Sequence, residues 1–205
     1  MIEQLACGVG RNDELLNIEL AKKLCESRDR RDIQEIADGM KSKDRAIAND
    51  CIKVLYEIGQ REPDLISEYT DEFIDLLSSR NNRMVWGSMT ALAYVSPIRS
   101  EVIFRRLPEI FQAYESGSVI TVDNSISVFA YLCKADEKYK EKIFPFLLGH
   151  ILHCRAKEIP QHAERISICI DPENKEAFMN VLTIREKELT KSQKNRVMRL
   201  TKNFD

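Results

Sequence analysis

The stretch that decides the fold runs from Leu92 to Ser96 and reads LAYVS. A matching stretch, Phe129–Cys133 (FAYLC), follows 37 positions later. The same step leads back to Leu55–Gly59 (LYEIG) and forward to Ile166–Ile170 (ISICI). Self-similarity at a fixed step of roughly 20–50 residues is typical of repeat proteins. We therefore expect a chain built from tandem units of 37 residues.

The repeated positions within each unit form two helical faces. Aligning four units gives eight columns of equivalent positions, four in each half of the unit. In the first half the columns are spaced 0, +3, +4 and +7, which is one face of an α-helix, and the second half has helical spacing too. Of the 32 positions, 31 are apolar, and Thr70 is the exception. Each unit is thus predicted to be two amphipathic helices joined by a polar turn.

This pattern predicts a single all-α domain over residues 1–205. Residues 12–26 match the second half of a unit and form an N-terminal cap helix. Four repeats follow over about 27–170, and a C-terminal capping helix pair covers 171–202. Asp171–Pro172 predicts the start of a helix at 172–189, since Asp and Pro are favoured at the first helix positions. The spacing of Thr190–Gln193 is that of a capping box that opens the final helix.

The first helices of the units contain prolines at equivalent positions. These helices are predicted to begin near Pro63, Ser100 and Glu137. Pro108 and Pro145 would then lie inside their helices and kink them, because an interior proline removes a backbone hydrogen bond. Alternatively, each helix begins at its proline, which is tolerated in the first turn.

The period of 37, the paired helices, the prolines of the first helices and the Ala91–Leu92 pair in a second helix resemble HEAT repeats of the armadillo-like class. The resemblance covers about 12–202. It implies a right-handed α-solenoid in which the second helices line the concave face. The HEAT signature of Asp followed by Arg is incomplete, since Asn81 and Ser118 stand in the Asp column after Asp44, and the Arg column holds only Ala and Val. We expect the repeats to pack through apolar contacts alone.

The face of each second helix opposite its apolar columns is the candidate binding surface. The residues expected there in the two central repeats include Arg83, Trp86, Tyr94, Asp123 and Tyr131. In the first repeat the same face holds Ala46, Asn49, Asp50, Lys53 and Glu57. Aromatic and Arg side chains are frequent anchors of recognition. We predict a non-enzymatic scaffold that binds a protein or peptide. Alternatively, the aromatic rings pack against neighbouring helices.

Charge argues against a nucleic-acid cradle on this face. The chain has 31 Lys and Arg against 33 Asp and Glu, and the predicted face has one more acidic than basic residue. The alternative function is that of the HEAT-like alkylpurine DNA glycosylases, whose architecture this chain resembles. Those enzymes need a basic DNA channel, and the acidic balance of the predicted face counts against this alternative. Basic residues gather instead in 175–205, with eight Lys and Arg against four Asp and Glu. This end is either a solvated capping face or a weak nucleic-acid site.

Signals for catalysis or a cofactor are absent from the sequence. The chain has no phosphate loop, dinucleotide motif or hydrolase motif. His150, His153, Cys154 and His162 are possible metal ligands, but we interpret them as chance neighbours. We predict no catalytic residues, no metal and no cofactor. A fragment of a longer repeat array is a further alternative.

The cysteines and the hydropathy indicate a compartment. Six cysteines without a CxxC pair fit buried free thiols in a reducing cytosol. No apolar run approaches the ~20 residues of a membrane-spanning helix, and the start lacks the features of a signal peptide. We expect a cytoplasmic protein with no membrane partner.

Overall fold

The computed structural model describes residues 1–11 and 13–204. Within these residues every regular element is helical, with eleven α-helices joined by turns and short 3-10 helices. The chain divides into two compact units, Met1–Ser125 and Ile126–Asp205, and the division falls within α7 (Val119–Ala135). Residue 12, where the cap helix is predicted to begin, lies outside the described residues. The all-α prediction is confirmed.

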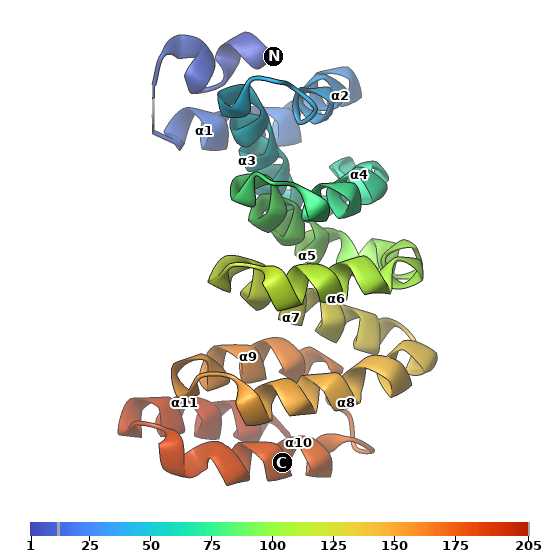
Figure 1. Ribbon diagram of the computed structural model, residues 1–205, viewed down its shortest axis with the longest axis vertical. Helices are drawn as coiled ribbons and strands as arrows, with labels where there is room; N and C mark the ends of the chain where they lie inside the picture. Colours follow the sequence, from blue (N-terminus) through green and yellow to red (C-terminus); the bar gives the residue numbers. More distant parts are fainter. Residues whose placement is uncertain (12, 205) are drawn as a thin grey trace. The chain divides into compact units, whose positions relative to one another are not determined.

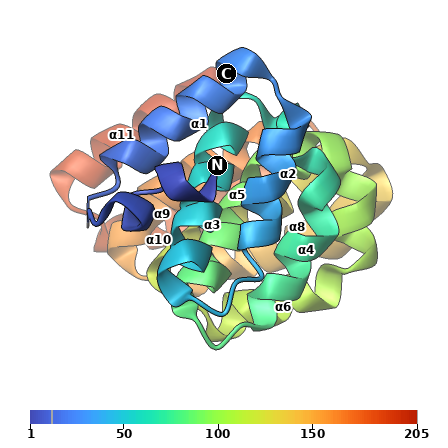
Figure 2. The same cartoon turned by 90° about the horizontal axis from the view of Figure 1, so that it is seen from above.

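The first unit is a succession of packed helices. Its members are α1 (Leu15–Ser27), α2 (Arg30–Gly39), α3 (Arg45–Arg61), α4 (Thr70–Asp75), α5 (Asn82–Arg105), α6 (Leu107–Ser116) and the first part of α7. α3 packs against both α1 and α5, while α2 packs on α3 and α4 packs on α5. Figure 1 shows α1, α3 and α5 following one another, and in Figure 2 α2 and α4 lie on the same side of α3.

The second unit repeats this sequential packing. It contains the rest of α7, α8 (Glu137–His153), α9 (Ile159–Ile166), α10 (Lys175–Arg185) and α11 (Lys191–Thr201). α8 packs against α9 and α10, and α11 packs against α9. The aromatic rings of Phe129 and Phe146 meet edge to face, with 5.1 Å between their centroids. Most of this packing thus joins helices two places apart along the chain, as α8 with α10 and α9 with α11.

The apolar columns of the sequence form the cores of these units. Of the 32 aligned positions, 28 are buried and the other four are half-buried. Thr70, the one polar member, is also buried, and its hydroxyl donates to the carbonyl of Ser67 at 2.7 Å. The hydroxyl therefore has a partner inside the protein, which removes most of the cost of burying it.

Short polar side chains begin several of the helices. The carboxylates of Asp29, Asp44 and Asp136 accept hydrogen bonds from the first backbone N–H groups of α2, α3 and α8. Asn81 does the same for α5, with 3.2 Å to the backbone nitrogen of Arg83. Such caps satisfy N–H groups that have no partner within the helix. Thr190 and Gln193 form the predicted capping box of α11.

The predicted helix starts are confirmed only in part. α8 begins at Glu137 as expected, but Pro63 opens a 3-10 turn and α4 follows at Thr70. The helix expected from Ser100 begins as the end of α5, beyond a kink with non-helical φ and ψ at Arg99, and resumes as α6. The kink lies two residues after Pro97, whose missing N–H interrupts the helical ladder.

The two aligned prolines differ in their settings. Pro108 lies in the first turn of α6, whereas Pro145 lies inside α8. The predicted start at Asp171–Pro172 is wrong, because the carboxylate of Asp171 accepts from the backbone of Glu173 and Asn174 and so caps a turn. α10 begins only at Lys175.

Hydrogen bonds and ion pairs also join successive helix pairs, so the expectation of purely apolar packing is wrong. In the first unit these ties are Arg28–Glu62, Arg30–Glu68, Asn81–Asn49 and Asn124–Thr90. In the second unit they are Arg165–Ser127, Lys140–Asp171 and Arg196–Glu164. They join residues 31 to 38 positions apart. Long polar side chains at the edge of each pair reach the next one in place of an Asp–Arg ladder.

Replacing Leu92 or Phe129 with Ala tests the cores. Both side chains are fully buried, so each change should lower the free energy of unfolding by about 2–5 kcal/mol in urea denaturation. Ile98→Ala is the matched control, since Ile98 lies on α5 with 46% of its surface exposed. Equal, small effects for all three variants would contradict the assigned core.

Candidate binding surface

Two aromatic rings and two cations meet in the first unit. Arg83 and Trp86 lie one turn apart at the start of α5, and the guanidinium carbon is 5.2 Å from the Trp86 ring centroid. The ring of Tyr56, on α3, lies 5.7 Å from that of Trp86, at 50° between their planes. Lys53 Nζ lies 4.8 Å from the centroid of Tyr56. Each ring thus has a cation at the distance at which its π face attracts one.

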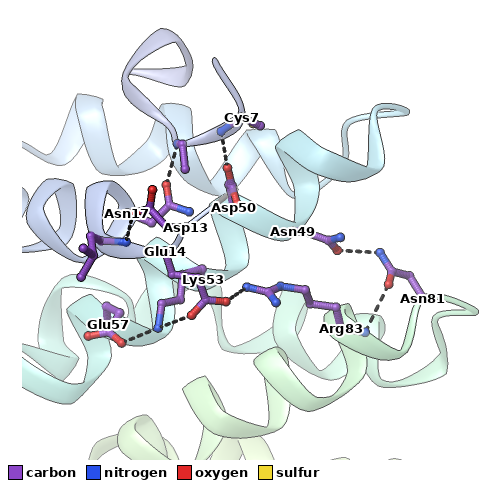
Figure 3. Close-up of polar contacts among 12 residues, drawn as sticks. Cys7, Asp13, Glu14, Asn17, Asn49, Asp50, Lys53, Glu57, Asn81 and Arg83 are labelled. Carbon is purple, nitrogen blue, oxygen red and sulfur yellow. Dashed lines mark hydrogen bonds and ion pairs between the residues drawn. The ribbon is translucent and has the colours of Figure 1, made fainter. Parts of the chain in front are cut away.

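A single carboxylate joins the two cations. Glu14, the residue before α1, accepts hydrogen bonds from the side chains of Arg83 and Lys53, the latter at 3.1 Å (Figure 3). Lys53 also donates to Glu57 at 2.8 Å, and Glu57 accepts from Arg61 at 2.7 Å. We call Glu14, Lys53, Tyr56, Arg83 and Trp86 the Trp86 cluster.

Close contact between α3 and α5 brings the two rings together. Gly87 follows Trp86, and a Cβ atom at that position would lie only 2.7 Å from Ile52 Cγ1 on α3. Any larger residue would push the helices apart or displace Ile52. Tyr94, further along α5, also contacts α3, since a Cβ atom at Gly59 would lie 3.4 Å from the Cβ atom of Tyr94, which is an ordinary contact distance. Gly87 therefore permits the close spacing of α3 and α5 at which Trp86 meets Tyr56.

The ionisation of the cluster follows from its contacts. Burial alone would raise the pKa of the Glu14 carboxyl, but hydrogen bonds from Arg83 and Lys53 lower it below its usual value. The pKa of Glu57 is likewise lowered, by Lys53 and Arg61, against the effect of burial. Burial would lower the pKa of Lys53, yet its hydrogen bonds to Glu57 and Tyr56 raise it. At neutral pH the cluster holds charged, paired groups.

The face expected to be open in the first repeat is partly covered. Lys53 and Glu57 are buried, with 6% and 9% of their surfaces exposed. Asp50 accepts a hydrogen bond from the backbone of Cys7 at 2.8 Å, and Asn49 pairs with Asn81. The N-terminal segment folds back against α3, as Figure 3 shows for Cys7 and Asp50. The repeat pattern cannot indicate this, because the segment precedes the first unit.

The predicted site residues have different settings. Arg83 and Trp86 are half-buried and in direct contact. Tyr94 and Asp123, on α5 and α7, are also half-buried. Tyr131 lies on the part of α7 that belongs to the second unit, where it too is half-buried. All five retain some exposed surface, so half-burial is compatible both with a binding role and with the alternative that the aromatic rings pack against neighbouring helices, as Trp86 does against Tyr56.

Hydrogen bonds extend the surface from Trp86 to α7. Thr90 donates to the carbonyl of Trp86 at 2.7 Å, and Asn124 donates to Thr90 at 3.0 Å. Asn124 also donates to the carbonyl of Ile120, whose side chain is 47% exposed. An exposed apolar side chain therefore lies beyond the polar residues that follow the aromatic pair.

Sequence reasoning missed Glu14 and Tyr56 as members of the site, and it placed Lys53 on the candidate face without linking it to Trp86. One signal was present, because Lys53–Tyr56 and Arg83–Trp86 each place a cation three residues before an aromatic ring. The two pairs are 30 residues apart rather than 37, so the aligned columns separated them. The contact depends on how far α5 is shifted along α3, which the period alone does not specify.

Ion pairs engage part of the basic C-terminal segment. Arg196 pairs with Glu164 and Lys194 with Glu186, while Arg185 is buried and pairs with Glu188. Lys191 and Lys202 are exposed. The positive charge is thus partly neutralised within the second unit, which favours a solvated capping face.

Three of the possible metal ligands lie together in the second unit. One donor atom each from His150, Cys154 and His162 falls within 4.8 Å of the others. His153 is exposed, and its Nδ1–H donates to the carbonyl of Gly149. Across the described residues the six cysteines form no disulfide, and Cys51, Cys133 and Cys169 are buried. Among residues 1–11 and 13–204, the structure contains no helix whose length and hydropathy would suit a membrane span.

Glu14→Gln tests the shared carboxylate. The change should lower the stability of the chain by about 1 kcal/mol at neutral pH, because both cations lose a charged partner. A carboxyl whose pKa is lowered by folding stabilises the protein above its unfolded pKa of about 4.5 and loses that effect as the pH falls further. The denaturation curves of the variant and the native chain should therefore converge below that pH.

The matched control is Glu19→Gln, an exposed residue on α1. It should leave the neutral stability almost unchanged. A stability difference for Glu14→Gln that stays constant across the acid range would contradict the assigned role of its charge.

No family model matches the chain, and no curated protein does. Among solved structures the chain is similar to an engineered protein, Northeast Structural Genomics Consortium Target OR329. The alignment has a TM-score of 0.56 at 15% identity and covers 98% of this chain and 96% of that one. At this identity the likeness concerns the fold alone. It supports the conclusion that the chain has an all-α fold of sequentially packed helices, similar to that of the engineered protein.

Proposed function

We propose that the chain is a right-handed α-solenoid of HEAT-like helix pairs with a period of 37, and that it acts as a binding scaffold without catalytic activity. The sequence columns, the sequential packing and the ties between residues 31 to 38 positions apart support this architecture. The four repeats cover about 27–170. The concave face, lined by the second helices, is the proposed recognition surface.

The Trp86 cluster is the proposed centre of this surface. Trp86 is half-buried, so it offers one part of its ring to a partner while Tyr56 fixes the other. A large ring held in place before binding loses little conformational entropy on association. This is the single observation that carries the proposal.

The proposed partner is a protein segment with a carboxylate beside an aromatic or apolar side chain. Arg83 already binds the carboxylate of Glu14, which is 42% exposed and therefore exchangeable. A carboxylate from the partner would take its place, since Arg offers a planar set of donors that matches this group. The apolar side chain would lie against Trp86 and toward Ile120.

A nucleic acid fits this surface less well. Phosphate binding needs a row of cations that can exchange counterions. Here Lys53 is buried between Glu14 and Glu57, and Arg61 also pairs with Glu57. The cations of α3 are thus already neutralised, which favours an acidic peptide over DNA and over a glycosylase activity.

Selection from a random peptide library tests the proposal. The full chain is the bait, and the selected peptides should be enriched in Asp or Glu next to aromatic or aliphatic residues. Trp86→Ala should reduce their affinity by about 30-fold or more, which corresponds to about 2 kcal/mol, as measured by calorimetry. Tryptophan fluorescence should shift on binding, because Trp86 is the one Trp of the chain.

Ile184→Ala is the matched control, an exposed apolar residue of α10 in the second unit with 57% of its surface accessible. It should leave peptide affinity unchanged. Peptides that bind the native chain and Trp86→Ala equally well would place the site elsewhere, and tight binding of a DNA duplex in a parallel titration would favour the nucleic-acid alternative.

A further inference from the structure

Two histidines and a cysteine converge where α8 ends and α9 begins. His150 lies in the last turn of α8, Cys154 is the residue that caps this helix, and His162 lies in α9. His150 Nε2 and His162 Nδ1 are 2.7 Å apart. The two rings are buried, with 7% and 0% of their surfaces exposed, whereas Cys154 is half-buried. A ligand at this point would be enclosed by the imidazoles and reach solvent beside the sulfur.

The backbone around these side chains is held from several directions. The N–H of Cys154 donates to the carbonyl of His150 at 2.8 Å, which closes the last turn of α8. Arg185, from α10, donates to the carbonyls of Ile151 and Cys154 at 2.6 and 2.9 Å. Arg185 is itself buried and fixed by Glu188 at 2.8 Å. These contacts fix the backbone at His150 and Cys154, and the hydrogen bond between the two rings positions His162.

The donor set and its spacing fit a zinc ion. Two imidazole nitrogens and a sulfur are ligands that zinc prefers, and hard cations such as magnesium avoid them. Around a tetrahedral zinc, with bonds of about 2.0–2.3 Å, donor atoms lie about 3.3–3.6 Å apart. The distances here range from 2.7 Å between the two nitrogens to at most 4.8 Å in the group. Side-chain movements of about 1 Å would bring all three into place.

We propose that His150, Cys154 and His162 bind one Zn²⁺ ion, with a water molecule as the fourth ligand. On binding, the thiol of Cys154 releases its proton to solvent and coordinates as thiolate. The proton between the two rings moves to a ring nitrogen that faces away from the metal, so each imidazole stays neutral and uses one lone pair as a ligand. The ion then joins α8 and α9 within the second unit. This site is independent of the Trp86 cluster.

The competing interpretation is a metal-free histidine pair. A hydrogen bond of 2.7 Å between two neutral rings satisfies both buried nitrogens that face each other. It gives no role to Cys154, whose sulfur donates a long hydrogen bond of 3.8 Å to the carbonyl of Ile151. Measurements that depend on the sulfur therefore distinguish the two interpretations.

Metal titration of the full chain tests the proposal. The protein is treated with a chelator, dialysed, and titrated with Zn²⁺ and, for its spectrum, with Co²⁺. One ion should bind per chain, and the cobalt form should show a thiolate-to-metal charge-transfer band with the visible bands of a tetrahedral site. Zinc should also raise the melting temperature, since it binds the folded state.

Cys154→Ser is the key variant, because a half-buried Cys tolerates this small change. It should abolish the charge-transfer band, weaken zinc binding by about 100-fold or more, and remove the thermal shift. His162→Gln should weaken binding to a similar extent, and circular dichroism checks that both variants fold. His153→Gln and Cys25→Ser are the matched controls and should bind zinc like the native chain. His153 is an exposed residue of α8, the helix that carries His150, and Cys25 is a half-buried residue of α1.

Two results would overturn the proposal. If the native chain takes up no zinc at micromolar concentrations, the histidines form a hydrogen-bonded pair only. If Cys154→Ser binds zinc as tightly as the native chain and the cobalt form lacks the thiolate band, the ion is held elsewhere.

Discussion

The aligned positions give the helices of the repeated units apolar faces, and covering these faces is the constraint on which the rest of the structure depends. An isolated pair of such helices leaves apolar surface in water, so every pair needs another beside it. The aligned positions are accordingly buried or half-buried, and α3 packs against both α1 and α5. The polar ties, such as Asn81–Asn49, act at the edges of these contacts and fix the position of one pair against the next.

The sequence predicted the apolar core well, but of the Trp86 cluster it indicated Arg83, Trp86 and Lys53 without their contacts, for a physical reason. Whether a helix residue is buried follows from the period of its apolar positions, and the eight aligned columns show that period directly. The Trp86 cluster depends on the shift of α5 along α3 and on the segment before α1, neither of which has a periodic signal. Helix starts were predicted in part. Those at Glu137 and Thr190 have strong local sequence signals, whereas the turn at Asp171 uses the same residue types as a helix cap and was mistaken for one.

The candidate metal site illustrates the same limit. His150 and Cys154 are one turn apart, which sequence spacing indicates, but His162 is reached only through the turn between α8 and α9. The conformation of that turn depends on Arg155, which pairs with Glu158, and on Arg185 from a helix further along the chain. Metal ligands on the two sides of a loop can be recognised as one site only when the conformation of the loop is known.

If an anion binds at Arg83 as proposed, the shared carboxylate of Glu14 would couple that binding to the order of α1. Glu14 precedes α1 and ties it to α3 and α5 through Lys53 and Arg83. Any anion that replaces it at Arg83 removes one of these ties, and the local opening of α1 becomes less costly. Because such coupling is reciprocal, conditions that fray α1 would also make Arg83 more available. Amide hydrogen exchange of α1 (Leu15–Ser27) would then report whether the proposed site beside Trp86, on α5, is occupied.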